Sequence, residues 1–246
     1  MAKNAPLGLA GLVLTAASIV LLFFIILPGV TNTSPLRQTY FLRADTDGIT
    51  GARDTTQWTF FYFCGLNNRD CSHARPAPAF GRAWDSNADN VPSQLIGSHG
   101  GDTTSTKFFY LWRFAWVLIL ITLFFEILAF FSGFLACCGR LGAAISGLIS
   151  AVALFFSSVA MSLMTATFVL ARNAFRSDGR SASIGRYAFG FGWASWAALF
   201  IATILFCIGL RGGDKRSPSS GRSWGRRRRS VRSHTYDGRR VKDDYS

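Results

Sequence analysis

Two cysteines, Cys64 and Cys71, are the residues of this 246-residue chain whose type and spacing could most readily do chemistry. Six residues separate them, so the pair could close a small disulfide ring or offer two thiolates to a metal ion. A lone pair at this spacing, without suitable histidines and acids around it, is a poor zinc site. His73 is near, but a single histidine beside such a pair is more often a polar surface residue than a metal ligand. The pair therefore predicts a disulfide, which requires an oxidising compartment.

Candidates for acid–base or nucleophilic chemistry are few. None of the three histidines, His73, His99 and His234, falls in a nucleophile, zinc or phosphate-binding motif. Glu126 is the one ionisable residue deep in an apolar segment. A carboxylate is energetically costly there. It therefore indicates either a functional site or a structural acid that is hydrogen-bonded by Ser or Thr of a neighbouring helix. We favour the second, because one acid without a basic partner does not make a transport path. The sequence predicts neither an enzyme nor a metal or cofactor site.

Four apolar segments must position these residues, and half of the chain is hydrophobic. A hydrocarbon core of ~30 Å takes ~20 helical residues to cross, and each segment is long enough. The first is longer than the ~7–15 residue core of a signal peptide and has no A-x-A cleavage site, so we expect an uncleaved anchor. The expected spans are residues 7–30, 108–138, 141–171 and 188–210.

Basic residues set the expected orientation. Lys and Arg number 26 against 13 Asp and Glu, a net charge of +13, and many of them lie in the tail, residues 211–246. The positive-inside bias therefore places both termini in the cytoplasm. The loop between the third and fourth spans disagrees, because only Asp178 offsets its arginines: Arg172, Arg176, Arg180 and Arg186. We give the tail more weight, because it is more basic and because the cysteine pair needs the oxidising side.

The predicted fold is an all-α membrane bundle of four helices with a small disulfide-pinned extracellular β-sheet. Its parts are the N-terminus with the first span (1–30), a long outer loop (31–107), spans two to four (108–210) and a disordered basic tail (211–246). In the loop, the aromatic and Thr-rich run 56–63 and residues 39–42 predict strands, and residues 45–48 a turn.

Small residues four apart predict the faces on which the helices pack, although such residues are common in membrane helices. The rows are Gly190, Ala194, Ala198 and Ala202 in the last span, and Ala143, Gly147, Ala151, Ser158, Ser162 and Ala166 in the third. Aromatic side chains near the outer span ends are expected in the headgroup layer. They are Trp112, Trp116, Tyr187 and Trp193.

The outer loop carries a motif that resembles a known family. Four spans with a W…C…C pattern in the first outer loop are claudin-like in plan, but the Gly-Leu-Trp run of true claudins is absent. The finer pattern resembles the fungal Sur-seven/PalI family of four-span plasma-membrane proteins, and it covers about residues 7–210. The matching residues are Gly48, Gly51, Thr56, Trp58, Thr59, Tyr62, Cys64, Cys71 and the PAPAF segment at 76–80.

This resemblance implies a protein of fungal cortical microdomains associated with eisosomes, with roles in membrane organisation, endocytosis, cell-wall integrity and sporulation. We expect a non-enzymatic organiser that works with other cortical membrane proteins or a second copy of itself. The alternative is an ambient-pH sensing component in the manner of the PalI branch. A transporter would need more polar groups in the spans.

The tail and the inner hairpin add further expectations. The run Arg226, Arg227, Arg228 and Arg229 begins about fifteen residues after the last span, near enough to bind anionic inner-leaflet lipids. Nucleic acid is a poorer partner, because four spans hold the chain at the membrane. Cys137 and Cys138, at the expected cytoplasmic end of the second span, are candidates for palmitoylation, although they could equally be small helix residues.

Overall fold

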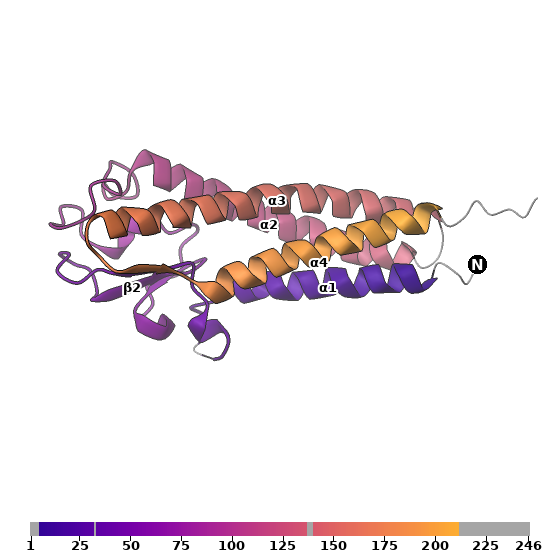
Figure 1. Cartoon of the computed structure of the whole chain (residues 1–246), viewed down its shortest axis with the longest axis horizontal. Helices are drawn as coiled ribbons and strands as arrows, with labels where there is room; N and C mark the ends of the chain where they lie inside the picture. The colour runs from indigo at the N-terminus through magenta and orange to yellow at the C-terminus, as the bar shows by residue number, and fades with distance from the viewer. Residues whose placement is uncertain (1–4, 32, 137–139, 212–246) are drawn as a thin grey trace, which may run out of the picture. The chain divides into compact units, whose positions relative to one another are not determined.

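Four long helices run alternately up and down, and a small sheet lies at one end of them (Figure 1). The computed structural model describes residues 5–31, 33–136 and 140–211. All four helices are long and apolar enough to cross a membrane, which confirms the predicted four-span class. They are α1 (Ala5–Ile26), α2 (Thr106–Ala136), α3 (Arg140–Ser177) and α4 (Arg186–Arg211).

The helix ends differ from the expected ones for identifiable reasons. The first helix stops at Ile26 and not at residue 30, because Pro28 has no N–H to donate and Gly29 takes a left-handed conformation with φ +96°. At the sheet end, α3 continues to Ser177, past the expected residue 171. With 31 and 38 residues, α2 and α3 exceed the ~20 needed to span a membrane. Their extra turns support the sheet.

The sheet is antiparallel, with strand order β3-β2-β1-β4. Leu42 pairs with Trp58 on one side and with Ile184 on the other. The bounds are β1 (Leu42–Asp45), β2 (Thr55–Trp58), β3 (Phe63–Cys64) and β4 (Ala182–Ile184), with short 3-10 turns η1 (Leu36–Gln38), η2 (Leu66–Asn68) and η3 (Phe80–Ala83).

Two strand predictions were wrong in their bounds. The run 56–63 does not form one strand: it turns back between β2 and β3, where the Thr59 hydroxyl donates to the Tyr62 carbonyl (3.0 Å) and accepts from the Tyr62 N–H (3.2 Å). The strand expected at 39–42 begins only at Leu42. No strand was predicted at β4, which comes from the loop between α3 and α4.

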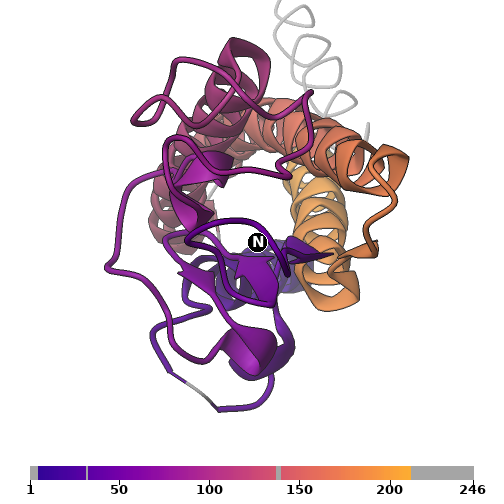
Figure 2. The ribbon, with the colours of Figure 1, turned by 90° about the vertical axis from the view of Figure 1, so that its left-hand side faces the viewer.

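An aromatic core joins the sheet to the helix ends. Leu42 and Ala44 of β1 are buried and Arg43 between them is exposed, the alternation expected of a half-buried strand. Seen from the sheet end, the sheet and loops lie across the ends of the helices (Figure 2). Large fully buried side chains fill the space between them: Phe41, Trp58, Phe60, Phe80, Trp112, Phe168 and Phe175.

The spacing of small residues predicted the buried helix faces only in part: Ala143, Gly147 and Ala202 are buried, and other members of the two rows are not. On α4, Gly190 and Ala194 are exposed, and only Ala202 of the predicted row is fully buried. On α3 the predicted Ser162 and Ala166 are exposed. From Ala143 onward, the buried small side chains of α3 follow a heptad-like spacing and not a spacing of four: Ala143, Ser146, Ser150, Ala153, Ser157 and Ala160.

Candidate functional site

The candidate site is the sheet with its loops, residues 33–105 and 178–185, which we call the cap. It contains the predicted motif. Trp58 is 1% exposed, and its ring packs against Phe80 (5.7 Å between centroids) and Phe175 of α3 (5.7 Å). The indole Nε1 of Trp58 is buried and has no hydrogen-bond partner within the described structure. Trp58 therefore anchors the cap to α3 through ring packing, not through a polar contact.

The other motif residues also support the cap. The Thr56 hydroxyl lies 2.8 Å from that of Thr46, so the two share a buried hydrogen bond across the β1–β2 connection. Thr59 closes the β2–β3 turn, as described above. The Tyr62 ring packs on Gly29, where a Cβ atom would come within 2.6 Å of Tyr62 Cδ2. These side chains hold the fold of the cap and its approach to α1.

A disulfide joins Cys64 of β3 to Cys71, which confirms the predicted pair. The loop between them turns through left-handed residues that Asn and Asp tolerate well: Asn67 (φ 60°), Asn68 (φ 53°) and Asp70 (φ 48°).

Asn68 in the disulfide loop is a residue that sequence reasoning missed. Its side-chain amide donates to the carbonyls of Leu36 and Thr39, both at 2.8 Å, and its backbone N–H donates to Gln57 Oε1 (3.0 Å). The disulfide loop is thereby bound to η1 and to β2. A signal was available, because an Asn-Asn pair inside so small a ring favours left-handed backbone and side-chain to main-chain hydrogen bonds.

Two tryptophans of α2 donate hydrogen bonds to the cap. Trp112 is only 2% exposed, and its Nε1 donates to the Pro78 carbonyl (2.9 Å). Trp116 donates to the Phe60 carbonyl (3.1 Å). For Trp112 the expectation of a ring in the headgroup layer was wrong, because the cap buries this ring, whereas Trp116 is half-buried. Tyr187 and Trp193 of α4 are exposed as expected, at 48% and 40%.

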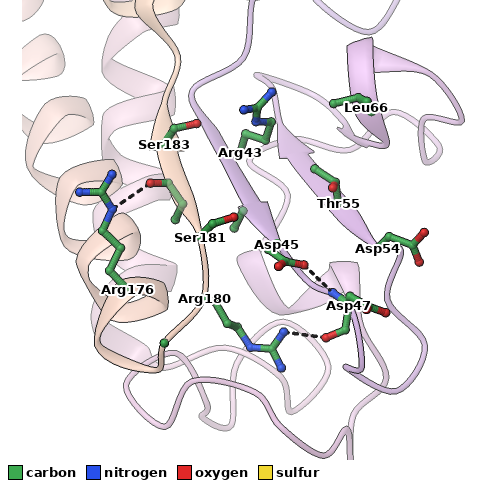
Figure 3. A pocket seen from close by; sticks show the side chains of 13 residues that line it. Arg43, Asp45, Asp47, Asp54, Thr55, Leu66, Arg176, Arg180, Ser181 and Ser183 are labelled. Carbon is green, nitrogen blue, oxygen red and sulfur yellow. Dashed lines mark hydrogen bonds between the residues drawn. The ribbon is translucent and has the colours of Figure 1, made fainter.

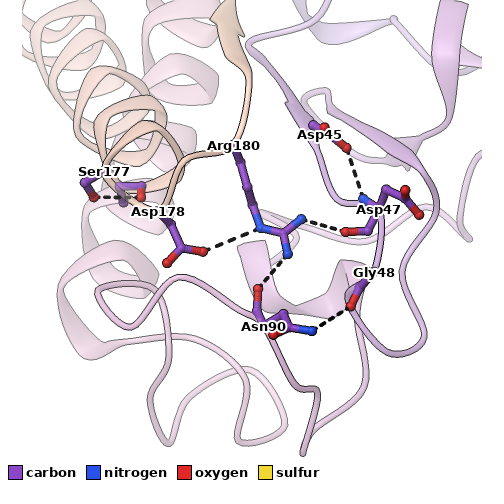
Figure 4. A network of polar contacts seen from close by, with 8 residues as sticks. Asp45, Asp47, Gly48, Asn90, Ser177, Asp178 and Arg180 are labelled. Atoms are coloured by element: carbon purple, nitrogen blue, oxygen red, sulfur yellow. Dashed lines mark hydrogen bonds and ion pairs between the residues drawn. The ribbon is translucent and has the colours of Figure 1, made fainter.

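Arg180 ties the short loop after α3 to the long loop (Figure 4). Its guanidinium donates to the carbonyls of Asp47 (2.7 Å) and Asn90 (2.9 Å) and lies 3.5 Å from the Asp178 carboxylate. Nearby, Arg176 donates to the Ala182 carbonyl of β4 (2.9 Å). Two of the arginines that disagree with the positive-inside bias therefore have a role in holding the cap.

A cavity of about 820 Å³ lies between these arginines and the sheet (Figure 3). Its charged lining is mixed: Arg43, Arg176 and Arg180 together with Asp45, Asp47 and Asp54. Opposite charges compensate one another there, so the cavity has no clear preference for an anion or a cation.

Glu126 of α2 is fully buried in the helix bundle, beside serines of two other helices. The Ser18 hydroxyl of α1 lies 3.0 Å from Glu126 Oε1 and 2.8 Å from the Ser195 hydroxyl of α4. Glu126 Oε2 is buried without a hydrogen-bond partner, and no salt bridge reaches this carboxyl in the described part of the chain. The arrangement links three helices through one polar contact.

Comparison with known proteins assigns this architecture to a family. The family model described as the SUR7/PalI family matches residues 7–205, which include the cap, α2, α3 and most of α1 and α4. The chain belongs to the SUR7/PalI family.

Relatives within the family are fungal membrane proteins. The chain is similar to the SUR7 family protein FMP45 of Saccharomyces cerevisiae, with 36% identity over 74% of this chain and 62% of that protein. It is also similar to Protein SUR7 of Candida albicans, with 34% identity over 79% of this chain and 70% of that protein. An uncharacterized plasma membrane protein of S. cerevisiae, YNL194C, is 30% identical over 76% of this chain and 63% of its own length. The chain thus spans about two thirds of the length of these relatives.

Several predicted sites of this SUR7/PalI member lie outside the described residues. They are Cys137 and Cys138, the palmitoylation candidates, and the tail arginines Arg226, Arg227, Arg228 and Arg229. Cys207 is a free, exposed cysteine on α4. Within the described ranges, no group of three or more His, Cys, Asp or Glu side chains could hold a metal ion.

Proposed function

We propose that this SUR7/PalI protein organises cortical microdomains of the fungal plasma membrane, of the kind associated with eisosomes, and catalyses no reaction. In this proposal the cap faces the cell wall, both termini lie in the cytoplasm, and the basic tail binds anionic lipids of the inner leaflet. Its partners are the bilayer, other cortical membrane proteins and a second copy of the chain.

The observation that carries the proposal is the structural role of the family motif. Trp58, Thr56, Thr59 and the Cys64–Cys71 disulfide all hold the cap together or fix it to the helices. The motif therefore supports a rigid surface held at a fixed height above the membrane, which suits a scaffold better than a catalyst. Membership in a family whose relatives include a protein named for the plasma membrane supports the same location.

The test is to image the full chain, tagged at its C-terminus, in a fungal cell beside an eisosome marker. The proposal expects stable cortical patches that overlap the marker. A variant with both Cys64→Ser and Cys71→Ser should lose the patches in part, because the cap loses its covalent closure. Cys207→Ser is the matched control, since Cys207 is outside the disulfide.

An even surface distribution of the wild-type chain would remove the organiser proposal while leaving the family and fold in place. If the chain were evenly distributed and its deletion changed only growth at alkaline pH, the pH-sensing role of the PalI branch would replace it.

A further inference from the structure

A second cavity, of about 390 Å³, lies where the cap meets the start of α4. Three arginines from distant parts of the sequence line it: Arg37 of η1, Arg43 of β1 and Arg186, the first residue of α4. Among the described residues that line this cavity, none is acidic. Arg43 lies between this cavity and the larger one, where Arg176, Arg180 and three aspartates complete the charged lining.

The three guanidinium groups are available to a ligand. Within the described ranges, none of them forms a salt bridge or donates a side-chain hydrogen bond, and all three residues are exposed. Arg43 lies 6.0 Å from the Tyr40 ring centroid, a contact that leaves its N–H groups free. Figure 3 shows the Arg43 side chain well away from Arg180, which is engaged with backbone carbonyls.

Three like charges around one small cavity repel one another unless an anion lies between them. Phosphate oxygens accept paired hydrogen bonds from the planar guanidinium group, which makes Arg the side chain best suited to hold them. The cavity also adjoins the N-terminus of the 26-residue α4, whose dipole adds positive potential there. Ser183 and Asn67 in the same lining could donate further hydrogen bonds to such an anion.

The position of the cavity points to a lipid as the source of the anion. The apolar span of α4 begins at Arg186, and the lining residue Tyr187 is 48% exposed. The Tyr187 ring packs against Phe191 (6.1 Å between centroids), which in turn contacts Phe24 of α1 (5.4 Å). A Tyr above such an aromatic group marks the headgroup layer of a membrane. A cavity of this volume is within the ~300–1,000 Å³ range of small-ligand sites.

We infer that Arg37, Arg43 and Arg186 form a phosphate-binding site for the headgroup of an anionic phospholipid in the leaflet on the cap side. The site fixes the cap to that leaflet in addition to the spans. It does not depend on residence in cortical patches, so a failure of the proposed function leaves it standing.

The test uses the full chain in a maltoside detergent, which carries no phosphate. Phosphatidylglycerol in mixed micelles is titrated in one arm and inorganic phosphate in the other, and hydrogen exchange is followed at residues 36–43 and 183–187. We expect phosphatidylglycerol to slow exchange in both segments. Arg43→Gln with Arg186→Gln should weaken this effect about tenfold or more, since hydrogen bonds to charged groups are lost.

Arg172→Gln is the matched control, because that arginine lies near the cap end of α3 and, within the described ranges, its guanidinium donates hydrogen bonds to Asn173 alone. A double variant with the same phosphatidylglycerol response as Arg172→Gln would overturn the site, and so would an absence of protection in both arms. Inorganic phosphate that protects the same segments at millimolar concentration would keep the phosphate site but assign it to a soluble ligand. Arg37→Gln, at an exposed position of η1, repeats the test should the double variant fold poorly.

Discussion

At the scale of single residues, Glu126 and Ser18 show how one polar contact can fix the packing of three membrane helices. A buried carboxyl has few ways to be satisfied in an apolar bundle, and here the Ser18 hydroxyl reaches both Glu126 and Ser195. Apolar side chains would leave these helices free to slide, whereas a hydrogen bond between helices specifies their register.

Glu126→Gln should preserve the fold, because the amide oxygen of glutamine can still accept from Ser18. Ser18→Ala should lower the free energy of unfolding by about 1 kcal/mol, the scale of hydrogen bonds between membrane helices. Thermal denaturation of the purified protein in detergent measures both. Thr122→Val is the control, since Thr122 is buried and, among the residues that the structure describes, its hydroxyl bonds to Leu118 of its own helix alone. Loss of expression with Glu126→Gln would contradict the structural role.

Arg180 acts on a different pair of segments, and its loss should open the cap locally. Arg180→Gln removes contacts to Asp47, Asn90 and Asp178, and we expect a loss of roughly 1–2 kcal/mol, because hydrogen bonds from charged donors exceed neutral ones. Hydrogen exchange should rise at residues 46–50 and 88–91 before the helices are affected. Arg75→Gln, on the exposed surface of the cap, should leave exchange there unchanged. Equal effects of both variants would show that Arg180 has no special role.

At the scale of elements, the junction of β4 with α4 is the tightest connection in the cap. The Gly185 N–H donates to the Phe41 carbonyl (3.1 Å), and a Cβ atom at Gly185 would lie 1.6 Å from the Tyr40 carbonyl oxygen. No side chain fits there unless the strand or the helix moves. The small residue at this position is what lets a fourth strand from a distant loop pair with β1.

Gly185→Ala should therefore separate β4 from β1 and destabilise the cap. Gly190→Ala, five residues later on the exposed face of α4, has nothing within 4 Å of its added methyl group. It should be neutral, or stabilising by roughly 0.5–1 kcal/mol because alanine favours helix over glycine. Thermal denaturation of the two variants gives the comparison. A Gly185→Ala protein as stable as Gly190→Ala would mean that the junction tolerates movement.

The Cys64–Cys71 disulfide closes the other edge of the sheet. Cys64→Ser combined with Cys71→Ser should cost about 2–3 kcal/mol, the chain-entropy value for a ring of this size. This loss of stability should lower the thermal transition temperature of the purified protein. Wild-type protein treated with reductant should show the same lower transition temperature as the variant. Cys207→Ser should behave as wild type under both conditions. A double variant with an unchanged transition would show that Asn68 and the aromatic core suffice to hold this loop.

The spans and the disulfide could be predicted from the sequence, whereas β4 and the contacts of the cap with α2 could not. Hydropathy and length suffice for the four spans, and the spacing of the two cysteines with the lack of metal ligands around them suffices for the disulfide, because these are local properties of the sequence. The pairing of β4 is not local: three residues of ordinary composition form a strand only because β1 offers its edge. Trp112 was misassigned for the same reason, since only the tertiary fold brings the cap over this end of α2.

At the scale of the whole molecule, the two ends of the bundle differ in chemistry. One end carries the cap with its disulfide, while the first residues of α1 and the last of α4 lie at the other end (Figure 1). If the cap lies on the oxidising side, the last residues of α4 lie at the cytoplasmic surface, where anionic lipids attract arginine. Cap and tail would then hold opposite leaflets through unrelated groups.

The tail can be tested apart from the bundle as a peptide of residues 212–246. Its binding to anionic vesicles should fall when Arg226, Arg227, Arg228 and Arg229 are changed to Gln, by about 1 kcal/mol for each arginine near the surface. Changing the same four to Lys keeps the charge and should keep most of the binding. Raising the salt concentration should weaken vesicle binding by the wild-type peptide until it approaches that of the Gln variant. Salt screens the attraction, with a Debye length of ~10 Å at 0.1 M. Cosedimentation with vesicles measures all three peptides, and equal binding of the Gln variant would leave the arginines with a role in membrane topology alone.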